Sequence, residues 1–277
     1  MGLFQQRPRD DHPTAKVVAY DIETICMGEE PADGSFPPIP QHRPVAAAFL
    51  ASTRLPEGRH DFRLDVLLCS EGREEQFLKK VDARLSPGVV GVGWNTRGFD
   101  NPVLRLQAIR HRVFDLSGLA RQTQTGRYDA IHCDLADQFS SYGSSRTLSL
   151  KAMCDALEIP VKITAAGNEV GKLWAAGDTK TVARYVADDA IATWLVWLHW
   201  AAWKTADPAE LALPAADFAT WLESDPQLAP FRAFADCPPV RWARSVAPGL
   251  RAGAALKDAE RRLARVRDEE AFSASPF

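Results

Sequence analysis

The sequence predicts an α/β fold in which helices flank a central mixed β-sheet, followed by a mostly helical C-terminal extension. A β-branched segment at 16–24 has apolar residues with a period of two, and two more strand-like segments follow at 45–53 and 62–70. Helical and strand patterns alternate from residue 74, and a long helical pattern covers 179–204. We therefore divide the chain into a polar leader (1–15), one α/β domain (16–204) and a helical, proline-rich extension (205–277).

The first strand ends in two acids. Its alternation places Val17, Ala19, Asp21 and Glu23 on one face, so both carboxylates project from the same side of the strand. Residues 27–44 then contain five prolines and two glycines, which predicts a long surface loop beside these acids.

The next segments predict an antiparallel meander and then a strand–helix junction. The turn at 55–58 joins the strands at 45–53 and 62–70. Residues 74–85 have helical spacing and end before Pro87-Gly88, and 89–94 is a short apolar strand directly followed by Asn95. A helix through about Arg110 opens at Asn101-Pro102, because proline is well tolerated in a first helical turn.

The second half is predicted to be mainly helical. Residues 114–146 mix polar loop with a strand or helix near 131–139, and the pattern fixes no boundary there. Residues 148–157 form a helix stopped by Pro160, and the helix from Thr179 contains a tryptophan-rich segment, 194–203, expected in the core. Beyond 205 we expect short helices packed on the body or a loose appendage, with a charged amphipathic helix at 255–270.

The composition is that of a compact globular protein with no strong charge bias. Of 277 residues, 46% are hydrophobic and 25% are charged. With a formal charge of −3, the chain lacks the excess of basic residues that is typical of proteins that bind nucleic acid tightly and statically. A nuclease stays compatible with this charge, because bound divalent cations would neutralise part of a carboxylate cluster.

Cysteine usage and the N-terminal sequence indicate a cytoplasmic protein. The five cysteines are an odd number, widely spaced, and form no Cys-x-x-Cys pair, which argues against a disulfide framework or a zinc ribbon. The N-terminal residues lack the apolar core of a signal peptide, and no apolar run has membrane-spanning length. We therefore expect no disulfide and no membrane partner.

Three motifs supply candidate metal ligands. They are Asp21-Ile22-Glu23-Thr24, Asn95-x-x-x-Phe99-Asp100, and Tyr185-x-x-x-Asp189. Carboxylates that converge from separate elements are the hard oxygen ligands that Mg²⁺ prefers, and two such ions about 3.5–4 Å apart can cleave phosphodiesters.

Each motif also has a simpler interpretation. Asp21 and Glu23 could be solvated acids at a strand end, and Asp100 could be a helix N-cap. Asp189 lies on the apolar stripe of its helix, where a metal or a salt bridge would compensate a buried carboxylate equally well. Asp188 lies on a different face and is expected to be solvated.

With all three motifs in order, the chain resembles the DEDDy branch of the ribonuclease H-like 3′–5′ exonucleases. It is most similar to the predicted exonucleases related to the proofreading domain of family B DNA polymerases. The segment 149–162, with Gly167-Asn168-Glu169-Val170 after it, is similar to the stretch between their second and third motifs. The resemblance covers about 16–203. A sister branch uses His-x-x-x-x-Asp, which does not fit because position 184 is Arg.

The resemblance implies a ribonuclease H-like fold and a set of site residues. It implies that Asp21, Glu23, Asp100 and Asp189 bind two divalent metal ions, Mg²⁺ or Mn²⁺, and that Tyr185 orients the attacking water. It also implies substrate contacts from Thr24, Asn95, Phe99 and Arg105. For Arg105, which lies in a basic run with Arg110, His111 and Arg112, a solvated helix face is an equal alternative.

The implied activity is metal-dependent 3′–5′ hydrolysis of phosphodiester bonds, on single-stranded DNA or a frayed 3′ end, with release of nucleoside 5′-monophosphates. One alternative is a 3′–5′ exoribonuclease, since no residue identifies a contact to a 2′-hydroxyl. A second is a catalytically silent nucleic-acid-binding protein. The sequence predicts a nucleic acid with a 3′ end as partner and identifies no protein partner.

Overall fold

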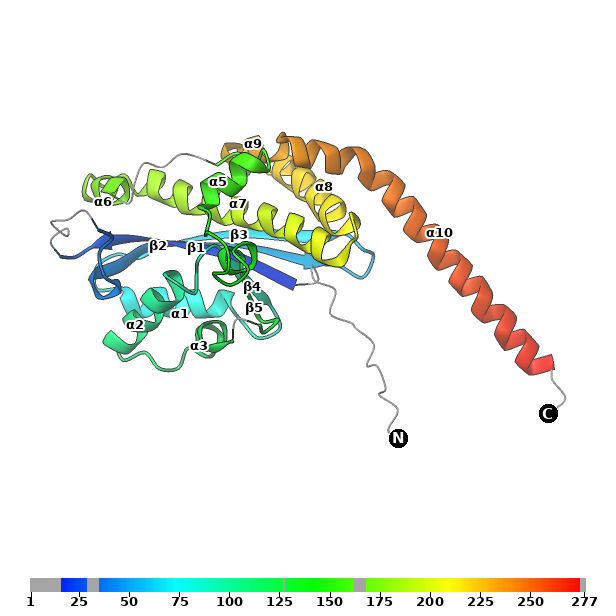
Figure 1. The fold of residues 1–277 in the computed structure, drawn as a ribbon, viewed down its shortest axis with the longest axis horizontal. Coiled ribbons are helices and arrows are strands. Elements are labelled where there is room, and N and C mark those ends of the chain that lie inside the picture. Colours follow the sequence, from blue (N-terminus) through cyan, green and yellow to red (C-terminus); the bar gives the residue numbers. More distant parts are fainter. Residues whose placement is uncertain (1–15, 29–34, 127, 162–167, 275–277) are drawn as a thin grey trace.

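The fold is built on a five-stranded mixed sheet. The computed structural model describes residues 16–28, 35–126, 128–161 and 168–274. The strand order is β3-β2-β1-β4-β5 (Figure 1). The strands are β1 (Lys16–Cys26), β2 (His42–Arg54), β3 (His60–Leu68), β4 (Val90–Gly93) and β5 (His132–Asp134). β2 runs antiparallel to β1 and β3, whereas β4 runs parallel to β1 and β5. The predicted α/β fold with a central mixed sheet is confirmed.

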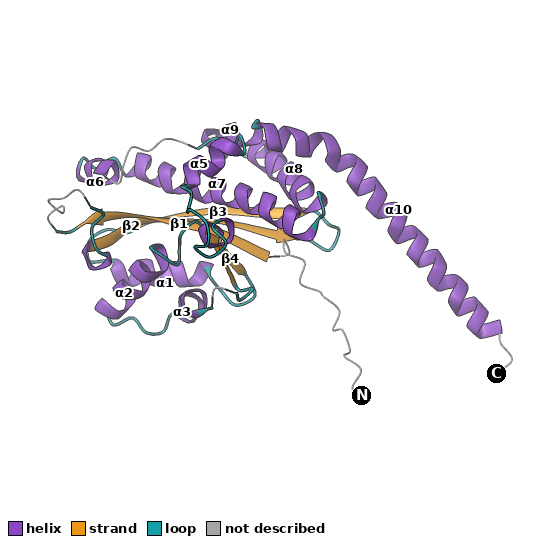
Figure 2. Cartoon of the chain, viewed as in Figure 1, coloured by secondary structure: helices purple, strands orange, loops and turns teal. Residues whose placement is uncertain are grey.

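Helices cover both faces of the sheet (Figures 1 and 2). One layer consists of α1 (Glu74–Arg84), α2 (Asp100–Arg110) and α3 (Ser117–Gln124). The other contains α5 (Leu150–Ala156), α6 (Asn168–Ala175), α7 (Thr179–Thr205) and α8 (Ala209–Ser224). The remaining elements are η1 (Ile39–Gln41), α4 (Leu135–Phe139), η2 (Pro226–Phe231), α9 (Arg232–Ala235) and α10 (Pro238–Ala274).

Strand β1 lies between the two helical layers, and its alternation assigns each side chain to one of them. Val18, Tyr20 and Ile22 belong to the apolar cluster of the α1–α3 layer. Val17 and Ala19 belong to the cluster of the α7 layer. Because side chains alternate along a strand, Asp21 follows Val17 and Ala19 onto the α7 side. The strand pattern therefore places an acid at the end of an apolar face.

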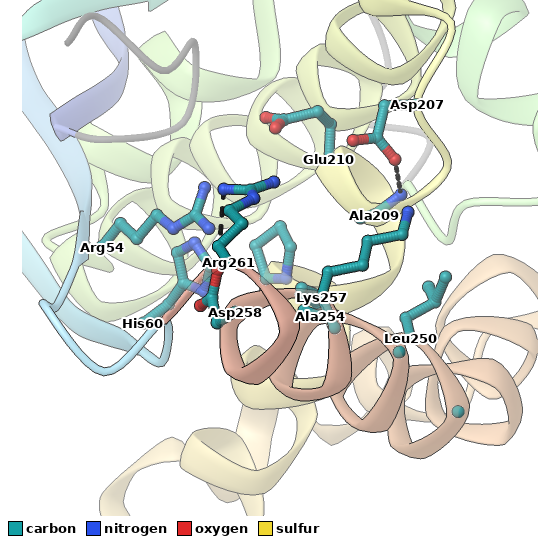
Figure 3. Close-up of a pocket in the computed structure, with 14 residues that line it drawn as sticks. Arg54, His60, Asp207, Ala209, Glu210, Leu250, Ala254, Lys257, Asp258 and Arg261 are labelled. Carbon is teal, nitrogen blue, oxygen red and sulfur yellow. Dashed lines mark hydrogen bonds and ion pairs between the residues drawn. The ribbon is translucent and has the colours of Figure 1, made fainter. Parts of the chain in front are cut away.

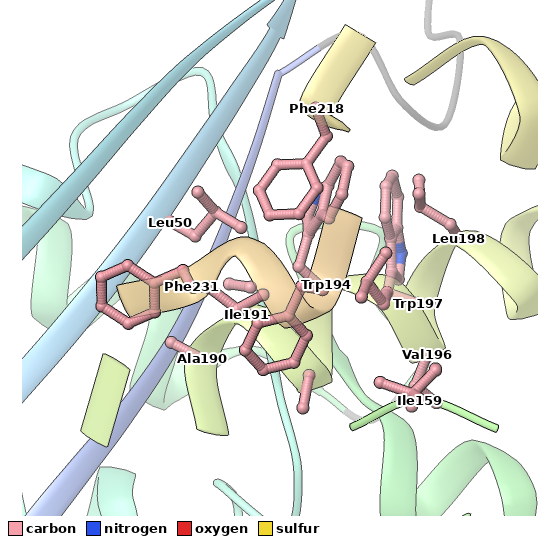
Figure 4. Close-up of a cluster of buried hydrophobic side chains, with 14 of the residues drawn as sticks. Leu50, Ile159, Ala190, Ile191, Trp194, Val196, Trp197, Leu198, Phe218 and Phe231 are labelled. Atoms are coloured by element: carbon pink, nitrogen blue, oxygen red, sulfur yellow. The ribbon is translucent and has the colours of Figure 1, made fainter. Parts of the chain in front are cut away.

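Helix α7 forms the centre of the larger core. Trp194 and Trp197 are buried in this core beside Phe218 (Figure 4). The centroid of the Trp194 ring lies 5.3 Å from that of Phe62 and 4.8 Å from that of Phe218. The expectation that the tryptophans of 194–203 are core residues holds for these two. It is wrong for Trp203, which is 75% exposed near the helix end.

The C-terminal helices pack on the body. α8 contacts α7 and β3, and residues of α8, η2, α9 and the start of α10 belong to the same apolar cluster as α7. α10 then extends away from the sheet (Figure 1), and residues 252–267 are exposed. No helix among the described residues is long and apolar enough to span a bilayer. The five cysteines are free thiols.

Two segments of the 16–204 domain differ from prediction in their structure, and the helix predicted at 255–270 is the end of the longer α10. The loop predicted over 27–44 is shorter among its described residues, because η1 occupies 39–41 and β2 begins at His42. Within 131–139 both alternatives occur in succession, since β5 pairs with β4 and α4 follows directly. The polar leader lies outside the described residues.

Candidate active site

Three of the predicted acids converge on one point. Asp21 and Glu23 extend from β1, Asp189 extends from α7, and one carboxylate oxygen of each lies within 4.8 Å of the others. All three side chains are half-buried. Asp189 lies 166 residues after Glu23 in the sequence, yet the three acids form one cluster that could hold a cation.

Asp100 joins this cluster from the start of α2 and also completes the sheet. β4 pairs with β1 only as far as Ala19, so the backbone of β1 beyond this point lacks a strand partner on that side. The Asp100 carboxylate, which is 3% exposed, accepts a hydrogen bond from the amide N–H of Ile22 at 3.0 Å. Asp100 lies in the first turn of α2, where the preceding Phe99 is the N-cap residue.

The four carboxyls destabilise one another's charged forms. Burial and the neighbouring acids raise the pKa of Glu23 to about 8, and burial is also the main cause that raises the pKa of Asp100 and Asp189 to about 7. The pKa of Asp21 also lies well above its ordinary value, through burial and repulsion from Asp100 and Asp189. A divalent cation would remove this repulsion, and the all-oxygen donor set fits a hard ion such as Mg²⁺ or Mn²⁺.

The second motif forms a strained turn held by a residue that sequence reasoning missed. Asn95 has a positive φ of 57°. The two oxygens of Asp134 accept hydrogen bonds from Asn95 N at 2.9 Å and Arg97 N at 2.8 Å. A Cβ on Gly98 would meet only the end of the exposed Asn95 side chain, which can rotate away, whereas a Cβ on Gly93 would collide with the buried side chain of Thr96, so glycine is required at 93. The available signal for Asp134 was its position before α4, whose N-terminus it caps.

The third motif lies on α7. Tyr185 and Asp189 are one turn apart, and the tyrosine is half-buried. The expectation for Asp188 is wrong, because this residue is 2% exposed rather than solvated. The Nε of Arg184 donates to Asp188 Oδ1 at 2.7 Å, which explains how the charge is accommodated inside.

An aromatic cluster adjoins the first two motifs. Thr24 Oγ1 and His42 Nδ1 are 2.9 Å apart, and the Phe99 ring meets His42 edge-on at 4.8 Å. Phe36 stacks on His42 at 4.9 Å, yet 67% of it is exposed. Phe36 was missed, and its only signal was an aromatic residue within the proline-rich segment. Of the other predicted substrate contacts, Asn95 and Arg105 are both exposed.

A separate cavity lies where the β2–β3 hairpin, α8 and α10 meet (Figure 3). Its volume is about 330 Å³, and its lining includes Arg54, His60 and Lys257. The carboxylate of Asp207 at its edge accepts a hydrogen bond from Ala209 N at 2.9 Å. None of the predicted site residues lines this cavity.

Comparisons with known proteins agree with the motif analysis. The model of a family described as predicted 3′–5′ exonucleases related to the exonuclease domain of PolB matches residues 34–236. No curated protein matches. A solved structure of exonuclease I is 16% identical with a TM-score of 0.40. Zinc-bound E. coli exonuclease I with single-stranded DNA is 15% identical with a TM-score of 0.43. These matches cover 75% of this chain but only 43–44% of the other chains.

Proposed function

Because the chain belongs to the family of predicted 3′–5′ exonucleases related to the exonuclease domain of PolB, we propose that it degrades DNA from the 3′ end. The substrate is single-stranded DNA, and the products are nucleoside 5′-monophosphates. The convergence of Asp21, Glu23 and Asp189 from β1 and α7 carries this proposal. The enzyme is of the DEDDy type, with Tyr185 in the third motif.

The acids divide between two cation positions. Asp21, Glu23 and Asp189 would hold one divalent ion, and Asp21 together with Asp100 would hold the other. When bound, such ions lower the pKa of a coordinated water and stabilise the charge on a leaving oxygen. The raised pKa values of Glu23 and Asp189 show that negative charge is costly in this cluster. A bound cation would lower that cost, because it would offset the burial and repulsion of the carboxylates.

Other side chains orient the reactants. The Tyr185 hydroxyl forms a hydrogen bond with the attacking water and so orients that water toward the phosphorus atom. Thr24, Asn95, Phe99 and Arg105 contact the terminal nucleotides. The exposed ring of Phe36, which meets the Phe99 ring edge-on at 5.3 Å between centroids, adds a face on which a base can stack.

The test is a time course on 5′-labelled single-stranded DNA and RNA of matched sequence with Mg²⁺, Mn²⁺ or EDTA. We expect a ladder that shortens from the 3′ end of DNA, requires metal, and is slower on RNA. Asp189→Ala should lower kcat at least a hundredfold, since losing about 3 kcal/mol of transition-state stabilisation has this effect.

The matched control is Asp155→Ala, which removes an exposed carboxylate on α5 that pairs only with Lys151 among the described residues. Its activity should stay within about twofold of wild type. Faster cleavage of RNA than of DNA would transfer the assignment to an exoribonuclease. Binding of either strand without cleavage under both metals would reject the catalytic proposal.

A further inference from the structure

The C-terminal extension contacts a charged residue of α7. The guanidinium carbon of Arg184 lies 4.2 Å from the centre of the Phe231 ring, where η2 ends. Phe231 is 9% exposed and belongs to the main apolar cluster. Aromatic rings attract cations over their faces, and more strongly when water is excluded. Phe231 therefore fixes the position of the Arg184 guanidinium.

Arg184 in turn holds Asp188. Its Nε donates to Asp188 Oδ1 at 2.7 Å, and the Asp188 side chain is 3% exposed. A short, charge-assisted hydrogen bond that is buried within one helical turn fixes the geometry of both side chains. The pair thus resists rotation or opening of this helical turn.

The two members of the pair directly precede the two catalytic positions. Arg184 is adjacent to Tyr185, and Asp188 is adjacent to Asp189, so the ion pair spans the same turn as the tyrosine and the metal ligand. In a helix, a shift of one of these residues moves its neighbour by a similar amount. A change in the Arg184–Asp188 pair should consequently displace Asp189 from Asp21 and Glu23.

We propose that the C-terminal extension positions the metal site, through a chain of contacts from Phe231 to Arg184 to Asp188. Arg184, Asp188 and Phe231 are positioning residues in this arrangement, since they act through the turn that carries Tyr185 and Asp189. This inference rests on the proposed function, because it assigns these residues a role toward the same cation site. Residues beyond 205 would then orient the metal ligands in addition to packing in the core.

The experiment measures Mn²⁺ binding to the full chain by titration calorimetry without substrate. Phe231→Leu and Arg184→Gln should each weaken Mn²⁺ binding by about tenfold, the usual effect of losing a residue that orients metal ligands. Arg184→Lys should recover little, because it lacks the planar group that stacks on the ring. With Mn²⁺ saturating, both variants should cleave with a kcat near that of wild type.

Phe234→Leu is the matched control. Phe234 lies three residues further along in α9, is 2% exposed, and belongs to the same apolar cluster. It should lower the thermal midpoint as much as Phe231→Leu and leave Mn²⁺ affinity within about twofold of wild type. Equal loss of Mn²⁺ affinity in the two leucine variants would overturn the proposal, since a general packing defect would then explain both.

A double variant tests the ion pair itself. Arg184→Gln with Asp188→Asn removes both members of the pair, so it should weaken Mn²⁺ binding by about tenfold, no more than Arg184→Gln alone, because the two residues act through one contact. Additive losses would overturn the proposal. Because Mn²⁺ titration needs no turnover, a wild type that binds Mn²⁺ without cleaving DNA would reject the proposed function while the positioning test still gives its own result.

Discussion

Without a divalent cation, the protein should lose stability as the pH rises from 6.5 to 8. A carboxyl whose pKa is higher in the folded state binds more protons when folded, so the free energy of unfolding falls until the pH passes the folded pKa. Glu23, with a pKa of about 8, and Asp100 and Asp189, with pKa values of about 7, all titrate in this window. The unfolded values lie near 4.

Buried His132 does not interfere in this range. Burial and Arg97 lower the pKa of His132 to about 3, so the folded protein binds fewer protons than the unfolded chain between pH 3 and about 6.5. The contribution of His132 to stability therefore rises with pH over that lower window and gains nothing more above it. His132 adds no slope of its own between pH 6.5 and 8.

The size of the effect follows from the fraction of each carboxyl still protonated. Over this window Glu23 loses about 2 kcal/mol, and Asp100 and Asp189 lose about 1 kcal/mol each, at about 1.4 kcal/mol per pKa unit. Since the groups are mutually coupled, we expect a total on the order of 3 kcal/mol. For a chain of this size that lowers the thermal midpoint by about 6 °C.

Thermal denaturation in EDTA at pH 6.5, 7, 7.5 and 8 measures this slope, and the same series in saturating Mg²⁺ is the comparison. With the cation bound, the acids stay deprotonated in the folded state, so the midpoint should be flat or rise with pH. Asp189→Asn should at least halve the slope in EDTA, whereas Asp155→Asn should not change it. A midpoint in EDTA that is constant or rises over this range would refute the buried, mutually repelling cluster.

Three substitutions test other parts of the site. Tyr185→Phe should lower kcat by about a hundredfold with little change in KM, measured by single-turnover cleavage, because only orientation of the water is lost. Phe36→Ala should raise KM about tenfold on normal 3′ ends but not on abasic ones, whereas Phe114→Ala, equally exposed, should change neither. Gly93→Ala should lower both the thermal midpoint and the activity, because its methyl group would collide with the buried side chain of Thr96, which lies in the turn before Asp100.

Much of the fold could be predicted because the patterns are local. The strand at 16–24 was placed within two residues of β1, and the helix predicted from Thr179 was placed within one residue of α7. Both have long, regular apolar periodicity. β5 is only three residues long and exists through its pairing with β4, so the sequence of 131–139 could not separate a strand from a helix.

The acids of the site were foreseeable for a different reason. A carboxylate at the end of an apolar strand or on an apolar helical stripe is conspicuous, and Asp21 and Asp189 both occupy such positions. Asp188 was wrongly expected in solvent because its compensation comes from Arg184 on the same helix and from packing by η2. The spacing of four residues signals the first partner, but burial by a segment more than 40 residues later has no local signal.

Asp100 links the fold to the site. Since β1 continues beyond the end of β4, an amide N–H of the strand remains without a strand partner next to the place where the acids gather. One carboxylate oxygen of Asp100 accepts a hydrogen bond from that amide, and the charge of Asp100 adds to the repulsion within the cluster. The fold therefore makes the site possible by leaving a strand end incompletely paired. The repulsion that results would be relieved by a cation in the same space, so the features that weaken the metal-free protein are those that we propose to bind the metal.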